Sequence, residues 1–320
     1  MKPTVYLLLL IAAGSGHSWA EDRNRVVRVV SVSQADLNRS APDFLEETME
    51  RLERASSFRP DIAALPELAI NGAPETVLEP AIARLSEWAK RNSSYVVFGA
   101  RTRVDGRLFN SAILLDRSGA VAGKYNKIHP TENELKSGIH PGQNDPPVFE
   151  TDFGIVGIQI CFDVNWWDSW RRLKQKGAKI VFFPSAYPAA RQIAAIALEN
   201  QFFVVASAQS GGSRIYDIVG DTMAASGRFQ PYAAAVLPVG KRLFEIDFNN
   251  AKARAILNKY GPKVEVTWHH DDDWFTLASL TPELTVDGLI AEFGLTPLDE
   301  YRMRAAKAID EVREGASKNR

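Results

Sequence analysis

Three residues with complementary chemistry stand next to apolar stretches of this 320-residue sequence. Cys161 directly follows GIVGIQI, Glu67 follows IAALP, and Lys127 lies in GKYNKIHP. A glutamate can take the proton of a thiol, the thiolate can attack a carbonyl or nitrile carbon, and a lysine can stabilise the charge that then develops. If the fold brings them together, the three side chains would form a catalytic site with a nucleophile, a base and a stabilising cation.

The surroundings of Cys161 favour a reactive thiol over an inert one. It is the only cysteine, so the chain has no intramolecular disulfide and no cysteine-built zinc site. It stands where a predicted strand ends and a helix begins near Asn165 or Trp166. The positive end of a helix dipole favours a thiolate. We therefore expect the environment of Cys161 to favour the thiolate form.

Strands and helices alternate along the chain and would place these residues at strand ends. Apolar and β-branched stretches predict strands, and apolar residues at helical spacing predict the helices between them. The predicted strands span 26–33, 61–65, 95–103, 110–116, 153–160, 179–184, 202–208, 213–219, 233–239 and 243–248, and the predicted helices span 41–56, 76–91, 166–176 and 189–201. The alternation indicates a layered α/β domain, in which two sheets could pack face to face.

The two ends of the chain differ from this pattern. Residues 1–20 are typical of a secretory signal peptide, with Lys2, an apolar run over 5–13 and small residues before Glu21. That run is shorter than the roughly 20 apolar residues a spanning helix needs. We expect cleavage after Ala20, and a periplasmic or secreted mature chain without a membrane span.

The C-terminal stretch has a helical pattern only. Thr281-Pro282 and Thr296-Pro297 each predict an N-cap followed by a proline at the first helical position. We expect one catalytic domain over 21–280 and a helical extension over 281–320. The extension would pack on the body or on a partner subunit.

Composition excludes several other classes of protein. With 38 Lys and Arg residues against 39 Asp and Glu, the chain has no basic footprint for nucleic acid. Its 21 Gly and 17 Pro residues are ordinary numbers for a globular protein. The His and Asp run over 269–273 is more typical of an acidic surface turn than of a metal site. We expect no metal and no cofactor.

The order of the motifs resembles the nitrilase superfamily of carbon-nitrogen hydrolases. ALPELAI holds Glu67, KYNKIHP holds Lys127 and GIQICFDVNWWDSWRRL holds Cys161, while GAKIVFFPSA and ALENQFFVVAS resemble segments that follow in the family. The resemblance runs from about Val26 to Phe248 in the family's order. It implies a four-layer α-β-β-α sandwich, here with a helical C-terminal extension, and a homodimer or larger homo-oligomer.

The resemblance also implies a role for each catalytic residue. Cys161 matches the nucleophile, Glu67 the general base, and Lys127 the cation beside the tetrahedral intermediate. The backbone N–H of Phe162 would join Lys127 in the oxyanion hole. Lys124 is the competing lysine, but the YNKIH context favours Lys127.

Further site residues are implied on either side of the cysteine. Glu134 matches the family's second glutamate, which orients the cysteine and lysine side of the site, and Glu132 is the alternative. Trp166 and Tyr187 could line an apolar acyl pocket, although packing in the core is an equally good interpretation.

The function implied is hydrolysis of a non-peptide C–N bond in a small amide, through a cysteine acyl-enzyme. Phe162-Asp163 is similar to amidases, whereas nitrilases tend to carry Trp-Glu there; IHPTENE is similar to a Pro-Thr stretch of some nitrilases. Many amidases carry Arg-Phe-Pro-Glu where residues 165–168 read Asn-Trp-Trp-Asp, so the substrate is not specified. The alternatives are a nitrilase, an acyl-transfer member, and a non-catalytic binding protein.

Overall fold

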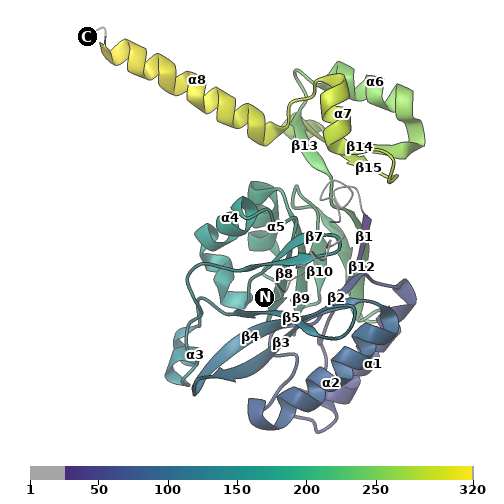
Figure 1. Ribbon diagram of the computed structural model, residues 1–320, viewed down its shortest axis with the longest axis vertical. Helices are drawn as coiled ribbons and strands as arrows, with labels where there is room; N and C mark the ends of the chain where they lie inside the picture. The colour runs from purple at the N-terminus through teal and green to yellow at the C-terminus, as the bar shows by residue number, and fades with distance from the viewer. Residues whose placement is uncertain (1–25, 319–320) are drawn as a thin grey trace, which may run out of the picture.

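The structure is a computed structural model that describes residues 26–318. The predicted signal peptide at residues 1–20 lies outside the described residues. Figure 1 shows two sheets between helices in the lower body, a smaller unit above them, and a helix that extends from this unit to the C-terminus. The residues predicted to be catalytic belong to the lower body.

The first sheet has six strands in the order β12-β1-β2-β3-β4-β5. They are β1 (Val26–Val32), β2 (Ile62–Ala64), β3 (Tyr95–Val104), β4 (Arg107–Leu115), β5 (Val121–Asn126) and β12 (Tyr232–Pro238). β1, β2 and β3 are parallel, and β12, β4 and β5 pair antiparallel to their neighbours. The carboxyl ends of β2, β3 and β5 therefore share one edge of the sheet.

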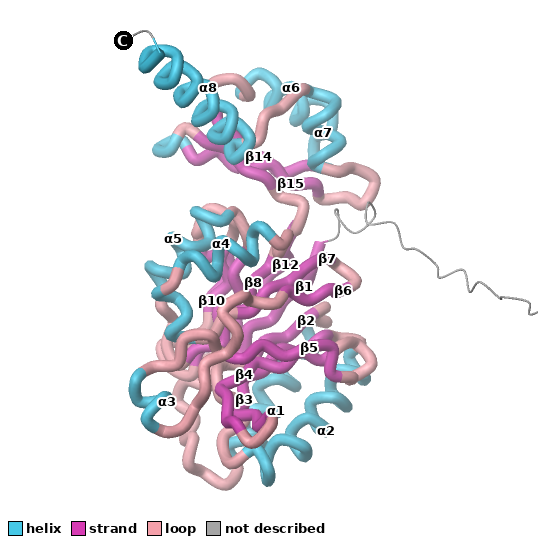
Figure 2. The backbone as a smooth tube through the Cα atoms, turned by 60° about the vertical axis from the view of Figure 1, so that its left-hand side comes forward, coloured by secondary structure: helices cyan, strands magenta, loops and turns pink. Residues whose placement is uncertain are grey.

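Two helices cover the outer face of this sheet, α1 (Phe44–Ala55) and α2 (Pro74–Asn92) (Figure 2). Leu52 of α1 and Trp88 of α2 pack with Ala63 and Phe98 of the sheet in one buried cluster. Each helix thus buries its apolar face and leaves its charged face to solvent.

The second sheet also has six strands, in the order β11-β10-β9-β8-β7-β6. They are β6 (Val148–Thr151), β7 (Gly154–Ile158), β8 (Ile180–Ser185), β9 (Phe203–Ala208), β10 (Arg214–Tyr216) and β11 (Thr222–Ala225). Helices α4 (Trp167–Gln175) and α5 (Ala190–Asn200) cover its outer face, where Trp170 and Ile193 pack with Phe183.

The inner faces of the two sheets pack against each other. Ile62 and Ala64 of β2 belong to the inner cluster, while Ala63 between them faces the helices, as the two-residue period of a strand requires. Ile158 of β7 and Phe182 of β8 join the same cluster from the second sheet. The layers are helix, sheet, sheet and helix, which confirms the predicted α/β fold and its α-β-β-α sandwich.

A third, smaller sheet follows in the order β13-β15-β14. Its elements are β13 (Arg242–Glu245), α6 (Asn250–Tyr260), β14 (Val264–His269), β15 (Trp274–Ser279) and α7 (Val286–Phe293), and Phe244 stacks on Phe275 in its core. The strand predicted over 243–248 belongs here and not to the large sheets. The predicted domain of 21–280 therefore contains a separate small sheet, and its boundary at residue 280 stays a prediction.

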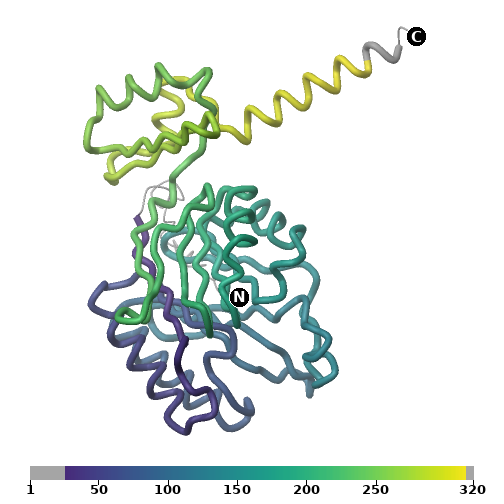
Figure 3. Tube along the Cα trace, turned by 180° about the vertical axis from the view of Figure 1, so that it is seen from behind, coloured from purple at the N-terminus to yellow at the C-terminus, as the bar shows by residue number. Residues whose placement is uncertain are grey.

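The C-terminal extension is helical, as predicted, and ends in α8 (Leu298–Lys318), which projects away from the body (Figure 3). The N-cap prediction at Thr281 is wrong. Helix α7 begins at Val286, because the Thr285 hydroxyl accepts a hydrogen bond from the Gly288 N–H at 2.6 Å. Helix α8 begins directly after Pro297, not at it.

The remaining helices are short. They are α3 (Glu132–Lys136) and the 3₁₀ helices η2 (Ser56–Phe58), η3 (Cys161–Asn165), η4 (Gly261–Lys263) and η5 (His270–Asp272). Of all the helices in the described part of the chain, none is long and apolar enough to cross a membrane.

Candidate active site

Cys161 lies just beyond β7, at the first position of η3, and is 7% exposed. Its backbone has a φ of 45°, in the left-handed region that residues other than glycine rarely adopt. Asp163 fixes this turn: its carboxylate accepts a hydrogen bond from the Ile160 N–H at 2.9 Å, and its own N–H donates to the Ile160 carbonyl at 3.0 Å. A strained, buried backbone held in this way is common at functional sites.

Glu67 and Lys127 lie at one edge of the first sheet and are 4% and 1% exposed. The chain turn at Glu67 packs directly on Gly99 of β3. A Cβ atom at Gly99 would lie 2.4 Å from the Leu68 nitrogen and 2.7 Å from the Glu67 Cα, so only glycine allows this approach. Lys127 follows β5, and its N–H donates to the Asn110 carbonyl at 2.8 Å.

Four side chains at this edge form a closed ring of hydrogen bonds, the carboxylate ring of Glu67, Lys127, Glu134 and Asn110. Lys127 Nζ donates to Glu67 Oε1 at 2.9 Å and to Glu134 Oε2 at 2.7 Å. Asn110 Nδ2 donates to Glu67 Oε1 at 2.8 Å and to Glu134 Oε1 at 2.7 Å. Two carboxylates and one ammonium leave the ring with one net negative charge, so it can accept a proton.

The second glutamate is positioned by a capping box at the start of α3. The Glu134 N–H donates to Thr131 Oγ1 at 3.2 Å, and the Thr131 N–H donates to Glu134 Oε2 at 2.8 Å. Glu134 Oε2 therefore accepts hydrogen bonds both from the Thr131 N–H and from Lys127 Nζ. Glu132 points elsewhere: its side chain is 90% exposed and lies 3.8 Å from Lys136.

Lys124, the competing lysine, is not part of the ring. It lies on β5, where it pairs with Ile113 of β4. The structure thus brings together Glu67, Lys127 and Glu134, and it leaves out both alternatives considered from the sequence.

The environment of Cys161 favours the neutral thiol, so the expected preference for the thiolate is wrong. Burial, followed by the charge of Glu67, raises the pKa of Cys161 to about 12, although Lys127, the backbone at Ala186 and Ser185 act in the opposite direction. Desolvation is the largest of these effects. A neutral thiol needs a base at the moment it attacks, and the carboxylate ring has the net negative charge that such a base requires.

Lys127 stays a cation despite its burial. Burial lowers its pKa, but the charges of Glu67 and Cys161 and the contact with Glu134 raise it further, so the pKa lies above its ordinary value. A permanent buried ammonium is suited to stabilising negative charge that develops on a substrate oxygen.

The other predicted site residues flank the cysteine. Trp166 is 38% exposed, stacks on His129 with ring centroids 4.0 Å apart, and contacts the Phe162 ring edge-on. Tyr187 is 38% exposed; burial, then the charges of Cys161 and Glu67, raise its pKa, which places it near both groups. Trp166 and Tyr187 therefore present partly exposed rings beside the site.

Two residues of the site were not predicted from the sequence. Asn110 closes the carboxylate ring, although asparagine in a strand carries no distinctive signal. Asp163 is fully buried and accepts hydrogen bonds from Tyr125 Oη at 2.7 Å and from the His129 N–H at 2.9 Å. Its position two residues after the cysteine was the available signal. No group of three or more His, Cys, Asp or Glu side chains within 26–318 is arranged to hold a metal ion.

Substituting the two candidate glutamates separates them experimentally. Glu134→Gln should lower kcat/KM by about 10- to 100-fold, because Lys127 loses a charged hydrogen-bond acceptor. Glu132→Gln, the matched control on the same helix, should leave kcat/KM unchanged. Equal losses in the two variants would mean that the charge of α3, and not the contact with Lys127, is what matters.

Comparisons with known proteins identify the family of this chain. The model of the family described as "Carbon-nitrogen hydrolase" matches residues 27–236. The deaminated glutathione amidase of Synechocystis is 32% identical over 122 residues, which cover 33% of this chain and 45% of that protein. The probable hydrolase YhcX of Bacillus subtilis is 31% identical over 227 residues, covering 67% of this chain and 42% of that protein. The chain thus spans less than half the length of these curated relatives.

Solved structures share the fold. An amidase from Nesterenkonia sp. superimposes with a TM-score of 0.59 at 20% identity, covering 67% of this chain and 90% of that one. A carbon-nitrogen hydrolase from Helicobacter pylori superimposes with a TM-score of 0.61 at 18% identity, covering 74% of this chain and 94% of that one. At such identities the likeness establishes the fold alone.

Proposed function

This chain belongs to the carbon-nitrogen hydrolase family, and from that premise we propose that it hydrolyses the C–N bond of a small, non-peptide amide through a cysteine acyl-enzyme. The observation that carries the proposal is the carboxylate ring beside Cys161. Together, Cys161 and the ring combine a nucleophile, a base that can accept one proton, and a buried cation in a single site.

Acylation begins with the neutral thiol. Glu67 takes the proton of Cys161 as the sulfur attacks the carbonyl carbon, so that a C–S bond forms and the carbonyl π electrons move onto oxygen. Lys127 and the backbone N–H of Phe162 stabilise this oxyanion. The intermediate then collapses, the C–N bond breaks, and the proton held by Glu67 passes to the departing nitrogen. Ammonia or an amine leaves, and a thioester remains on Cys161.

Deacylation uses the same groups on a water molecule. Glu67 takes a proton from the water as its oxygen attacks the thioester carbon, and Lys127 again stabilises the oxyanion. The C–S bond then breaks, a carboxylic acid is released, and the sulfur regains its proton. One base thus serves both half-reactions and ends in its starting state.

The role of Glu67 can be measured directly. Glu67→Gln should lower the acylation rate by about 10²-fold or more, because the thiol keeps its proton and a glutamine cannot accept it. The measurement is the rate of acylation in a single turnover, monitored by stopped-flow or quenched-flow mixing. An unchanged acylation rate would show that another group deprotonates Cys161.

The substrate class is tested by product release. Purified protein is incubated with a panel of carboxamides, N-carbamoyl amines and nitriles, and ammonia or amine is quantified against Cys161→Ala. Release from amides supports the proposal, and release from nitriles alone would assign the chain to the nitrilase alternative. Acyl transfer to an added amine without net hydrolysis would point to the transferase alternative.

We also propose that the mature chain acts in the periplasm or outside the cell. The proposal is supported by the charged start, apolar run and small residues of 1–20. Export should yield a mature chain that begins at Glu21, which intact mass measurement of protein from the periplasm or medium would detect. Association into a homodimer or larger homo-oligomer stays a prediction, which light scattering can check.

A further inference from the structure

The geometry points to Asn110 as a positioning residue that holds Glu67 and Glu134 at a fixed separation around Lys127. This inference rests on the proposed function, since it assigns Glu67 as the base. Asn110 would not touch the substrate. It would act through the two carboxylates, and its side-chain amide is the only uncharged member of the carboxylate ring.

Asn110 contacts every other member of the ring. It lies on β4 and is 1% exposed. Its side-chain nitrogen donates one hydrogen bond to each glutamate, at 2.8 and 2.7 Å. Its main-chain carbonyl accepts from the Lys127 N–H at 2.8 Å. One residue therefore fixes both acids and the backbone of the lysine.

The side-chain oxygen of Asn110 shows which of its contacts matters. Oδ1 is buried and has no hydrogen-bond partner among the described residues. An unsatisfied buried acceptor is costly, and most asparagines avoid it. Turning the amide over would place Oδ1 against two carboxylate oxygens, so the glutamates dictate the orientation. The residue leaves its acceptor unpaired in order to keep both donors on the acids.

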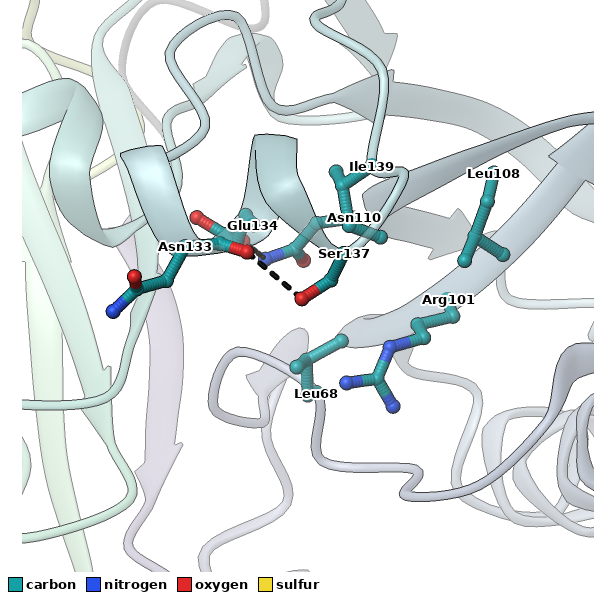
Figure 4. A pocket seen from close by; sticks show the side chains of 8 residues that line it. All are labelled: Leu68, Arg101, Leu108, Asn110, Asn133, Glu134, Ser137 and Ile139. Carbon is teal, nitrogen blue, oxygen red and sulfur yellow. Dashed lines mark hydrogen bonds between the residues drawn. The ribbon is translucent and has the colours of Figure 1, made fainter.

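A pocket of about 370 Å³ lies beside Asn110 and Glu134 (Figure 4). It is lined by Leu68, Arg101, Leu108, Asn110, Asn133, Glu134, Ser137 and Ile139. Asn110 and Glu134 thus line this space, whereas Lys127 is not among its lining residues. A smaller residue at 110 would join the pocket to the ring and admit water to the two carboxylates, whereas the asparagine supplies fixed donors.

The side-chain amide of Asn110 also lowers the pKa of Glu134. Burial raises the pKa of Glu134, but the charge and hydrogen bond of Lys127, followed by the hydrogen bond from Asn110, bring it below its ordinary value. The titratable groups outside the ring that interact with it are Cys161, Tyr187 and, through Glu67, Arg39. Loss of the Asn110 donor should let the ring take up a proton at higher pH, where it can no longer act as a base.

Two variants test the inference. Asn110→Leu removes both donors and keeps the branching of the side chain, and Asn110→Asp keeps the size but adds a third carboxylate. Both should lower kcat/KM by about 10- to 100-fold, mainly through kcat, and raise the acid limb of the pH–rate profile by about one pH unit. If Asn110→Leu fails to fold, Asn110→Asp carries the test. The matched control is Asn200→Leu on α5, which is 5% exposed and donates to the Ile196 carbonyl at 2.8 Å, away from the ring.

Alkylation of Cys161 by iodoacetamide against pH gives a readout that needs no substrate. In the wild type the rate should fall as the carboxylate ring becomes protonated, and the Asn110 variants should show this fall at higher pH. Asn200→Leu should lose stability without moving it. An unmoved acid limb in the folded Asn110 variants would overturn the inference. If the wild type shows no turnover of any amide but the Asn110 variants still show the shifted alkylation profile, the proposed function alone is overturned.

Discussion

Replacing Cys161 by alanine should lower turnover by about 10⁴-fold or more while leaving the melting temperature close to that of the wild type. The substitution removes the only nucleophile and a single sulfur atom, and alanine meets the left-handed backbone of this position no worse than cysteine does. The measurement is product release at saturating substrate, together with thermal unfolding of both proteins.

Cys161→Ser sharpens this test. It keeps a hydroxyl at the same place, but a serine hydroxyl is harder to ionise than a thiol, and Glu67 alone faces a larger proton-transfer barrier. We expect activity close to that of the alanine variant. Activity near the wild-type level would contradict a reaction through the cysteine sulfur.

Lys127→Met should lower both the stability and the activity of the protein. Turnover should fall by about 10³-fold, because the oxyanion loses its buried cation. The free energy of unfolding at pH 7 should fall by about 3–5 kcal/mol, because two buried carboxylates would face each other with only Asn110 between them. Urea unfolding and kcat/KM measure the two effects.

The pH dependence of the stability of the Lys127→Met variant shows why this variant is less stable than the wild type. Without the ammonium, the folded state favours a protonated carboxyl, so its carboxyl pKa lies above the unfolded value. The deficit in stability should therefore shrink as the pH falls through that pKa. Lys136→Met is the control, since that side chain is 74% exposed and pairs only with Glu132. An equal deficit at pH 7 and pH 5 would show that lost packing, not repulsion, destabilises the variant.

The sequence predicted the parts of the site that depend on strand ends. Glu67 and Cys161 follow short apolar strands, and parallel strands in facing sheets bring such residues to one edge. The hydrophobic alternation of the strands likewise predicted the layered fold. These features are local, so a stretch of a few residues is enough to indicate them.

The remaining features depend on contacts between distant segments. Asn110 reaches Glu67 only because β4 pairs with β3 in a register that sets it opposite Arg101. The pKa of Cys161 depends on how deeply its side chain is buried in the folded protein, and the neighbouring residues in the sequence do not reveal this depth. The third sheet was also missed, apart from β13, since its strands join through a helix and an irregular turn. The hydrogen bond from the His129 N–H to Asp163 likewise joins two segments that are distant in the sequence.

Intact mass spectrometry of the purified protein with the amide panel detects a covalent acyl-enzyme at Cys161 directly. Samples are quenched in acid during turnover, with Cys161→Ala treated in parallel. We expect a substrate-dependent increase in mass that equals the acyl group, maps to Cys161, and is absent from the alanine variant. Product release without any adduct at Cys161, or with undiminished rate in Cys161→Ala, would contradict it.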